Sequence, residues 1–314
     1  MPLDLSVFQC ALPYRGFEPD DWKTLAGILR EVRFPEEKFL FREGDPGDGI
    51  YFIRSGQVNI LRRFQVEGRP KPVEQLLAVL DAGQVLGEMA LIEGDTRSAD
   101  AACAEGTVLY HLGGTAYKRL KHNHPLTALR LQDILVVTLC SRLRAAKVQS
   151  SRGERTMTLD TSIFQDAQPY RGFTMSDWQV LSETLKEVRA QADKPLFREG
   201  DPGNGLYFIR SGRVKILRRV QAEGRNEEQE QLLTVLDAGQ LFGEMALIDG
   251  DTRSAEAVAD QESVLYHLPG DAYAVLKREH PRTALRLQDL LVNTLCARLR
   301  AANTNFEIIK FWLT

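Results

Sequence analysis

The chain repeats its own sequence after 156 residues, and the repeat covers nearly its whole length. The segment at 41–47 recurs at 197–203, and Gly87 recurs as Gly243 with the same offset. Because the offset is constant, no net insertion separates the two copies between these positions. A period this long indicates a duplicated domain, since the repeats of solenoids span about 20–50 residues. Each half has the size of an ordinary globular domain, about 100–150 residues.

A polar, glycine-containing stretch lies between the two halves, from Gln149 to Thr156. Its composition favours a linker. We therefore expect a first domain at 1–148, a linker at 149–156 and a second domain at 157–314. The second domain ends in a short apolar tail, from Phe306 to Leu313.

The charge of the chain is nearly balanced, with 40 Lys and Arg against 43 Asp and Glu. A nucleic-acid partner needs a basic face or stripe, so we expect none, although the totals leave room for a local basic patch. Cys10, Cys103, Cys140 and Cys296 form no CxxC pair, which favours reduced thiols. No secretory signal and no apolar run of about 18 residues is present. We therefore expect a cytoplasmic protein without membrane insertion.

Each half is expected to begin with a helix. In the first half the apolar spacing from Leu25 to Val32 predicts a helix that ends before Pro35, because proline cannot continue it. In the second half, Thr174 or Ser176 is the expected N-cap.

Short apolar segments separated by glycine turns follow the first helix. The expected strands of the first half lie around 39–42, 51–53, 58–61, 76–80 and 108–112. Many short strands of this kind predict a sandwich or a barrel. The glycines at 44, 47 and 49 do not match the G-x-G-x-x-G spacing of a dinucleotide loop, so we interpret them as turn residues.

Each half is expected to close with a long helix, at 125–147 and at 281–302. Neither range contains an internal glycine or proline. Both are apolar on more than one face, and such a helix needs more than one packing partner. We expect each to pack on its own β domain and on the equivalent helix of the other half, which would make the chain an intramolecular pseudo-dimer.

The strongest chemical signal is the segment Gly-Glu-Met-Ala-Leu-Ile at 87–92, followed by Thr-Arg-Ser-Ala at 96–99, because both recur 156 residues later. A helix that starts after Gly87 offers free backbone N–H groups to an anion. Arg97 can hold a phosphate by a charge-assisted hydrogen bond. Glu88 suits a hydroxyl donor such as a ribose 2′-OH. The alternative is a surface Glu–Arg pair on a strand connection, which a recent duplication would also preserve.

The pattern G-E-M-A-L-I-x-G-D-T-R-S-A is similar to the phosphate-binding cassette of cyclic nucleotide-binding domains. Both halves resemble the ligand-binding domains of the bacterial catabolite activator and of protein kinase A regulatory subunits, and the segments at 43–56 and 199–212 resemble the family's glycine turn. The resemblance implies a mainly β fold with flanking helices. It consists of two tandem jelly-roll-like β-rolls, each with an N-terminal helical segment and a C-terminal hinge helix.

The resemblance also implies the ligand contacts. Glu88 and Glu244 would hold the ribose 2′-OH, and Arg97 and Arg253 would hold the cyclic phosphate. The full expected ligand-binding set is Gly87, Glu88, Met89, Ala90, Arg97, Ser98, Ala99, Gly243, Glu244, Met245, Ala246, Arg253, Ser254 and Ala255.

The choice of nucleotide depends on weaker signals. Ser98 and Ser254 after the arginine resemble the bacterial cAMP receptors, so cAMP is favoured, but serine also serves cGMP sites. Thr138 and Thr294 are polar positions on the closing helices and could contact the base. The alternative for both is a hydroxyl bonded to its own helix backbone.

No catalytic or metal-binding pattern accompanies the cassettes. The five histidines form neither H-x-H nor H-E-x-x-H. We therefore expect no enzyme activity, no metal and no catalytic cofactor. Too few residues follow 302 for a helix-turn-helix, so we expect a stand-alone cAMP sensor that transmits ligand occupancy through its hinge helices to an unidentified protein partner. The alternatives are an interaction module with empty cassettes and an enzyme that uses the β-roll as a pocket.

Overall fold

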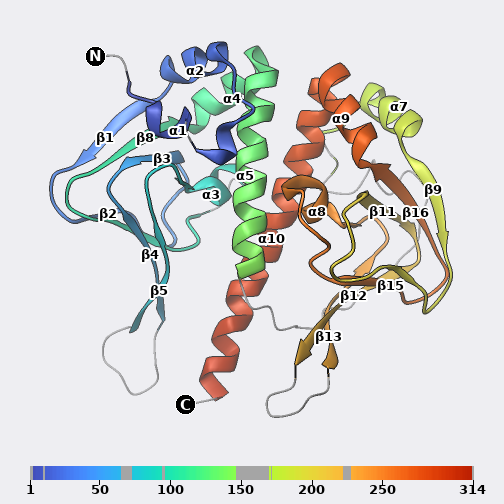
Figure 1. Ribbon diagram of the computed structural model, residues 1–314. Helices are drawn as coiled ribbons and strands as arrows, with labels where there is room; N and C mark the ends of the chain where they lie inside the picture. Colours follow the sequence, from blue (N-terminus) through green and yellow to red (C-terminus); the bar gives the residue numbers. More distant parts are fainter. Residues whose placement is uncertain are drawn as a thin grey trace. The chain divides into compact units, whose positions relative to one another are not determined.

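The computed structural model describes residues 3–9, 11–64, 73–93, 96–145, 170, 172–221 and 228–312 (Figure 1). They form two compact units, 1–138 and 139–314, which are described separately below. The division falls within the helix that begins at Pro125. The expected linker at 149–156 lies outside the described residues.

Short helices begin the first unit: α1 (Ser6–Gln9), a 3-10 turn η1 (Leu12–Tyr14) and α2 (Pro19–Ala26). Glu18 and Asp21 form a capping box at the start of α2, and Pro19 occupies its first turn. The expected helix through Val32 is wrong, because α2 ends before Gly27 and strand β1 (Arg30–Phe34) follows. Residues 31–34 alternate between charged and apolar side chains, which is the period of a strand.

Two antiparallel four-stranded sheets form the body of the first unit, in the orders β1-β8-β3-β6 and β2-β7-β4-β5. The strands besides β1 are β2 (Lys38–Phe41), β3 (Gly49–Ser55), β4 (Val58–Phe64), β5 (Val73–Leu80), β6 (Val85–Leu86), β7 (Asp100–Cys103) and β8 (Thr107–Gly113). Ile53 and Leu109 from one sheet and Val58 and Cys103 from the other belong to one buried apolar cluster. The two sheets therefore enclose a single core, as in a β-roll.

The second unit repeats this arrangement, with sheets in the orders β14-β11-β16-β9 and β10-β15-β12-β13. Its elements before the closing helices are α7 (Met175–Thr184), β9 (Lys186–Ala190), β10 (Pro195–Phe197), β11 (Gly205–Ser211), β12 (Arg213–Gln221), β13 (Glu228–Asp237), β14 (Leu241–Phe242), α8 (Glu244–Asp249), β15 (Glu256–Ala259) and β16 (Ser263–Pro269). Thr174 is the N-cap of α7, in a capping box with Asp177. The predicted fold of two tandem β-rolls with flanking helices is confirmed.

Two helices close each unit. A short helix, α4 (Gly114–Asn123) or α9 (Gly270–Glu279), which the sequence analysis did not anticipate, precedes the predicted long helix. The long helices are α5 (Pro125–Ala145) and α10 (Pro281–Trp312). The expected end of the second long helix near residue 302 is wrong, because the backbone of α10 continues to Trp312.

A buried aspartate fixes each long helix to the first helix of its own unit. Asp177 of α7 accepts hydrogen bonds from Thr283 at 2.7 Å and from Arg286 at 2.8 Å, both on α10. Asp21 of α2 accepts equivalent bonds from α5. Hydrogen bonds from Thr174 and Thr283 hold the pKa of Asp177 below its usual value, although burial by itself raises it.

Candidate functional site

Each cassette begins with a glycine in the left-handed region of backbone space. Gly87 has φ of +82° and precedes α3 (Glu88–Glu93), and Gly243 has φ of +78° and precedes α8. A Cβ on Gly87 would lie 2.5 Å from Nη1 of Arg97, and one on Gly243 would lie 2.7 Å from Nη1 of Arg253. Glycine is therefore required both for the turn into the helix and for the close approach of the arginine.

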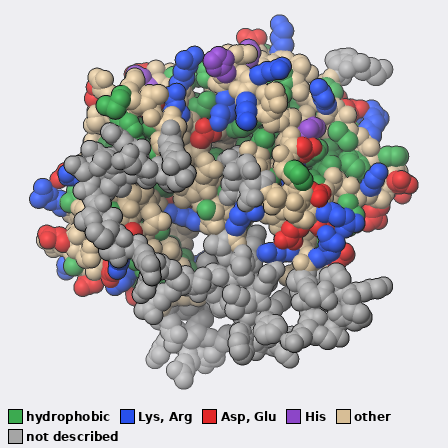
Figure 2. Space-filling model, turned by 180° about the vertical axis from the view of Figure 1, so that it is seen from behind, with side chains coloured by type: hydrophobic (Ala, Val, Ile, Leu, Met, Phe, Trp, Pro, Cys, Tyr) green, Lys and Arg blue, Asp and Glu red, His purple; other side chains and the backbone are tan. Residues whose placement is uncertain are grey.

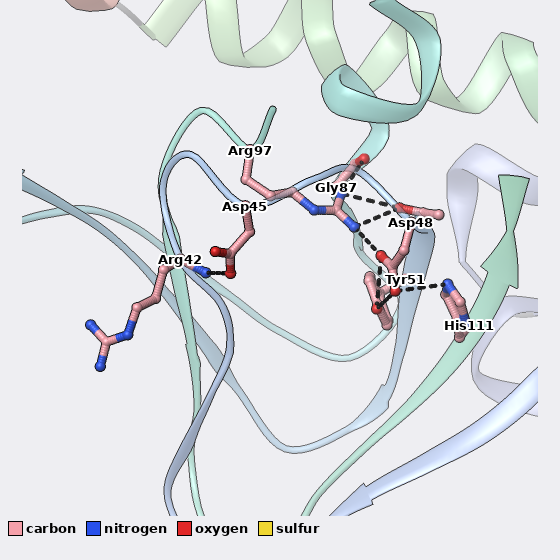
Figure 3. Close-up of polar contacts among 8 residues, drawn as sticks. Arg42, Asp45, Asp48, Tyr51, Gly87, Arg97 and His111 are labelled. Carbon is pink, nitrogen blue, oxygen red and sulfur yellow. Dashed lines mark hydrogen bonds and ion pairs between the residues drawn. The ribbon is translucent and has the colours of Figure 1, made fainter. Parts of the chain in front are cut away.

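The Arg97 guanidinium is enclosed by the β-roll, with the residue only 2% exposed (Figure 3). Its Nη1 donates to the carbonyl oxygens of Gly87 at 2.8 Å and Gly49 at 3.1 Å, and its Nη2 pairs with Asp48. The ring centroid of Phe41 lies 4.2 Å from its Cζ. This burial argues against the alternative of an exposed surface pair.

Asp48 is the centre of a polar cluster in the first unit (Figure 3). It accepts a hydrogen bond from the Tyr51 hydroxyl at 2.9 Å and lies 3.8 Å from Nε2 of His111. The His111 ring stacks on Tyr51, with 4.5 Å between centroids. Burial lowers the pKa of His111 despite the nearby carboxylate, so this ring is neutral near pH 7.

The second unit reproduces the arginine with a different partner. Nη1 of Arg253 donates to the Gly243 carbonyl at 2.6 Å, and its Nη2 donates to Oδ1 of Asn204 at 2.6 Å. Phe197 again lies under the guanidinium, at 4.1 Å. Burial lowers the pKa of Arg253.

The cassette glutamates are buried, each with 1% exposure. In the second unit, Oε1 of Glu244 accepts a hydrogen bond from Arg298 of α10, and the other guanidinium nitrogen of Arg298 donates to the Leu241 carbonyl at 2.6 Å. The second oxygen, Oε2 of Glu244, is buried and accepts no hydrogen bond from the described residues. An acceptor is thus open where a hydroxyl could donate.

The remaining expected site residues lie around these groups. The hydroxyls of Ser98 and Ser254 each contact a methionine sulfur of their own cassette, at 3.6 Å. The cassette residues Met89, Ala90, Ala246 and Ala255 are buried.

The two threonines proposed for base contact bond to their own helices. Thr138 donates to the Ile134 carbonyl at 2.8 Å, and Thr294 donates to the Leu290 carbonyl at 2.9 Å. These contacts favour the alternative in which the hydroxyl satisfies its own helix backbone.

The sequence analysis missed Asp48, Asn204 and Arg298. A signal for the first two was present, because positions 48 and 204 differ within an otherwise matched glycine turn. Arg298 lies in a helical motif that repeats Arg142 after 156 residues, but its contact with Glu244 depends on how α10 packs against α8.

Other chemistry is limited within the described part of the chain. There, no group of three or more His, Cys, Asp or Glu residues could hold a metal ion. Cys103, Cys140 and Cys296 are buried, and Cys10 lies outside the described residues. None of the described helices is long and apolar enough to span a membrane.

On the face in Figure 2, basic and acidic side chains lie among one another.

The family model described as "Cyclic nucleotide-binding domain" matches residues 31–124 and again residues 187–280. The chain therefore belongs to the cyclic nucleotide-binding domain family and contains two copies of that domain. Each match covers most of one β-roll and its cassette.

Curated relatives resemble parts of the chain. The cyclic AMP receptor protein of Thermus thermophilus is 39% identical over 118 residues, which is 38% of this chain and 50% of that protein. The cGMP-dependent protein kinase egl-4 of Caenorhabditis elegans is 24% identical over 76% of this chain and 25% of the kinase. The chain thus matches half or less of the length of these relatives.

Two solved structures are also similar to parts of this chain. The regulatory domain of Toxoplasma gondii PKA with cAMP aligns with 88% of this chain and 91% of its own, at 18% identity and a TM-score of 0.34. The Thermus thermophilus catabolite activator protein aligns with 46% of this chain and 64% of its own, at 31% identity and a TM-score of 0.39.

Proposed function

We propose that the chain is a sensor with two sites for a 3′,5′-cyclic purine nucleotide, with cAMP favoured over cGMP. One observation carries the proposal. In each unit a buried arginine and a buried glutamate lie at a glycine-started helix, and the same residues do so twice. A ligand with one negative charge next to a sugar hydroxyl could place the charge at the arginine and the hydroxyl at the glutamate.

The phosphate would bind at the arginine and at the first backbone N–H groups of α3 or α8. Nε of Arg97 and Nε of Arg253 are buried and have no hydrogen-bond partner among the described residues. A buried donor without a partner is costly, and a phosphate oxygen would supply the missing acceptor.

The ribose would bind at the glutamate. Oε2 of Glu244 is the open acceptor in the second unit. By the repeat, Glu88 would act in the same way in the first unit. The preference for cAMP is supported by Ser98 and Ser254, while the names of the relatives include both a cyclic AMP receptor and a cGMP-dependent kinase.

Transmission would proceed through the closing helices. Glu244 already bonds to Arg298 of α10, so a ligand that engages Glu244 changes the surroundings of that helix. A ligand shifts such an equilibrium only by its differential affinity for the two states. We propose that a protein partner responds to the helix and that the chain regulates without catalysis of its own. We also propose that the two domains span residues 1–148 and 157–314.

Calorimetric titration of the full chain with cAMP, cGMP, 5′-AMP and adenosine tests the ligand class. We expect cAMP to bind most tightly and cGMP more weakly. Adenosine lacks the phosphate and should lose on the order of tenfold to a hundredfold in affinity. Absence of binding by both cyclic nucleotides would favour a scaffold with empty cassettes. Turnover of a nucleotide or a tightly bound metal would favour an enzyme.

A further inference from the structure

The two sites differ in charge at one position that touches the phosphate-binding arginine. Asp48 pairs with Nη2 of Arg97 in the first unit, and Asn204 occupies the equivalent place beside Nη2 of Arg253. Arg97 also donates to the Gly49 carbonyl, whereas the described hydrogen bonds of Arg253 go to Gly243 and Asn204. Three other neighbours are shared by the two units. They are Phe41 with Phe197, Tyr51 with Tyr207, and Gly87 with Gly243.

The substitution removes a charge and keeps a hydrogen bond. Oδ1 of Asn204 accepts from Arg253 at 2.6 Å, so Nη2 of the second arginine keeps a hydrogen-bond partner at this position. The Asn204 amide cannot neutralise that guanidinium. Among the described residues, no carboxylate forms an ion pair with Arg253, whereas Arg97 has Asp48.

We propose that the two nucleotide sites are unequal, with the second site binding the anionic ligand more tightly because Asn204 replaces the carboxylate of Asp48. The inference rests on the proposed function, since it concerns the phosphate of the same ligand. At the first site the arginine and Asp48 together carry no net charge. At the second site the arginine keeps its full charge for the ligand.

Simple electrostatics sets the size of the difference. An anion bound to Arg97 lies well within the Debye length of about 10 Å from Asp48, so the carboxylate repels it. The side chain of Asp48 is 59% exposed, which screens this repulsion toward the value in water. We therefore expect a ratio of affinities of about tenfold, near the strength of two unit charges interacting at a protein surface.

The burial of Arg253 supports tighter binding of an anion at the second site. Desolvation lowers the pKa of this guanidinium, which is the signature of a buried charge that its surroundings do not fully compensate. A phosphate at this place would supply the counter-charge that Asp48 already supplies in the first unit.

The test uses full chains in which only one site is intact, titrated with cAMP by calorimetry. Arg253→Ala with Glu244→Ala disables the second site, and Arg97→Ala with Glu88→Ala disables the first, because each pair removes both the phosphate and the ribose contact. We expect the chain with the intact second site to bind cAMP about tenfold more tightly. Asp48→Asn, added to the Arg253 and Glu244 pair, should tighten the first site by about tenfold. Asn204→Asp, added to the Arg97 and Glu88 pair, should weaken the second site to a similar extent.

The exchanges between Asp and Asn preserve side-chain shape, and a thermal melt of each variant checks that it folds. Wild-type chain provides an independent measurement, since two unequal sites give a two-step isotherm. Equal affinities at the two sites, unchanged within twofold by both exchanges, would overturn the inference and leave the proposed function standing. Folded wild-type chain that binds neither cAMP nor cGMP would instead refute the proposed function, and the inference would fall with it.

Discussion

Arg298 of α10 donates a hydrogen bond to Glu244 at the start of α8, so a single carboxylate connects the second cassette with the closing helix. Glu244 is 1% exposed, and its other oxygen is open. The residue that we assign to the ribose is therefore also the residue that fixes the hinge helix. We propose that ligand occupancy affects α10 through this hydrogen bond.

Removal of Arg298 should disconnect the helix from the cassette. Arg298→Ala leaves a buried carboxylate without its cationic partner, which should cost the second unit about 1.5–3 kcal/mol. Hydrogen exchange with and without cAMP should then show a smaller ligand effect on α10 than in the wild-type chain. Arg282→Ala, at an exposed position of the same helix, is the control. Ligand-induced protection that never reaches α10 in the wild-type chain would contradict the proposed route.

Loss of either cassette arginine should disable mainly its own site. Arg97→Ala and Arg253→Ala each remove a charged hydrogen bond to the phosphate, worth about 1.5–3 kcal/mol. The affected site should lose roughly tenfold to a hundredfold in affinity for cAMP in a calorimetric titration. If the double variant binds cAMP as the wild type does, these arginines do not hold the phosphate.

The buried Asp177 should make the second unit sensitive to acid. Its folded pKa is depressed, so the stability that it contributes is present above the unfolded pKa of about 3.9 and is lost as the pH falls below it. Asp177→Asn should therefore give a shallower loss of stability below about pH 4. Hydrogen exchange at 175–184 and 281–290 is the suitable measurement, because a two-domain chain need not unfold in one step.

Two further variants sharpen this test. Thr283→Val removes a 2.7 Å hydrogen bond to Asp177 and should destabilise α10 against α7 by about 1–3 kcal/mol. Asp193→Asn changes an exposed turn carboxylate and should leave these segments as stable as in the wild type. A pH dependence in Asp177→Asn as steep as in the wild type would show that other carboxyl groups cause the acid sensitivity.

We expect the two units to form an intramolecular pseudo-dimer, because the long helices are apolar on more than one face. Small-angle X-ray scattering measures this in solution. A compact chain of 314 residues should have a radius of gyration of about 20 Å. A markedly larger radius, with a scattering profile of two separated bodies, would count against pairing of the helices.

The sequence predicted the repeated architecture well, because a duplicated motif with a constant offset specifies both the number of domains and the place of each cassette. The prediction placed residues 30–34 in the first helix, because Leu25, Leu29 and Val32 fit a helical spacing. In the structure the helix ends before Gly27, and residues 30–34 form a strand. The segment forms a strand because it pairs with β8, and Val32 lies opposite Leu109 in that pairing.

The candidate site was predicted only where one motif contains the residues. Gly87, Glu88 and Arg97 lie within one segment of 11 residues, and the same segment recurs in the second repeat. The neighbours Asp48 and Arg298 come from a turn before the cassette and from a helix after it. Only the packed fold brings those side chains to the arginine and to the glutamate.

The number of cyclic nucleotides that each chain binds tests the central claim most directly. Isothermal titration of the full-length chain with cAMP should give two ligands per chain, since each β-roll contains a buried arginine and a buried glutamate at its cassette. A stoichiometry of zero or one would contradict the account, because at least one of the two cassettes would then be unable to hold the nucleotide.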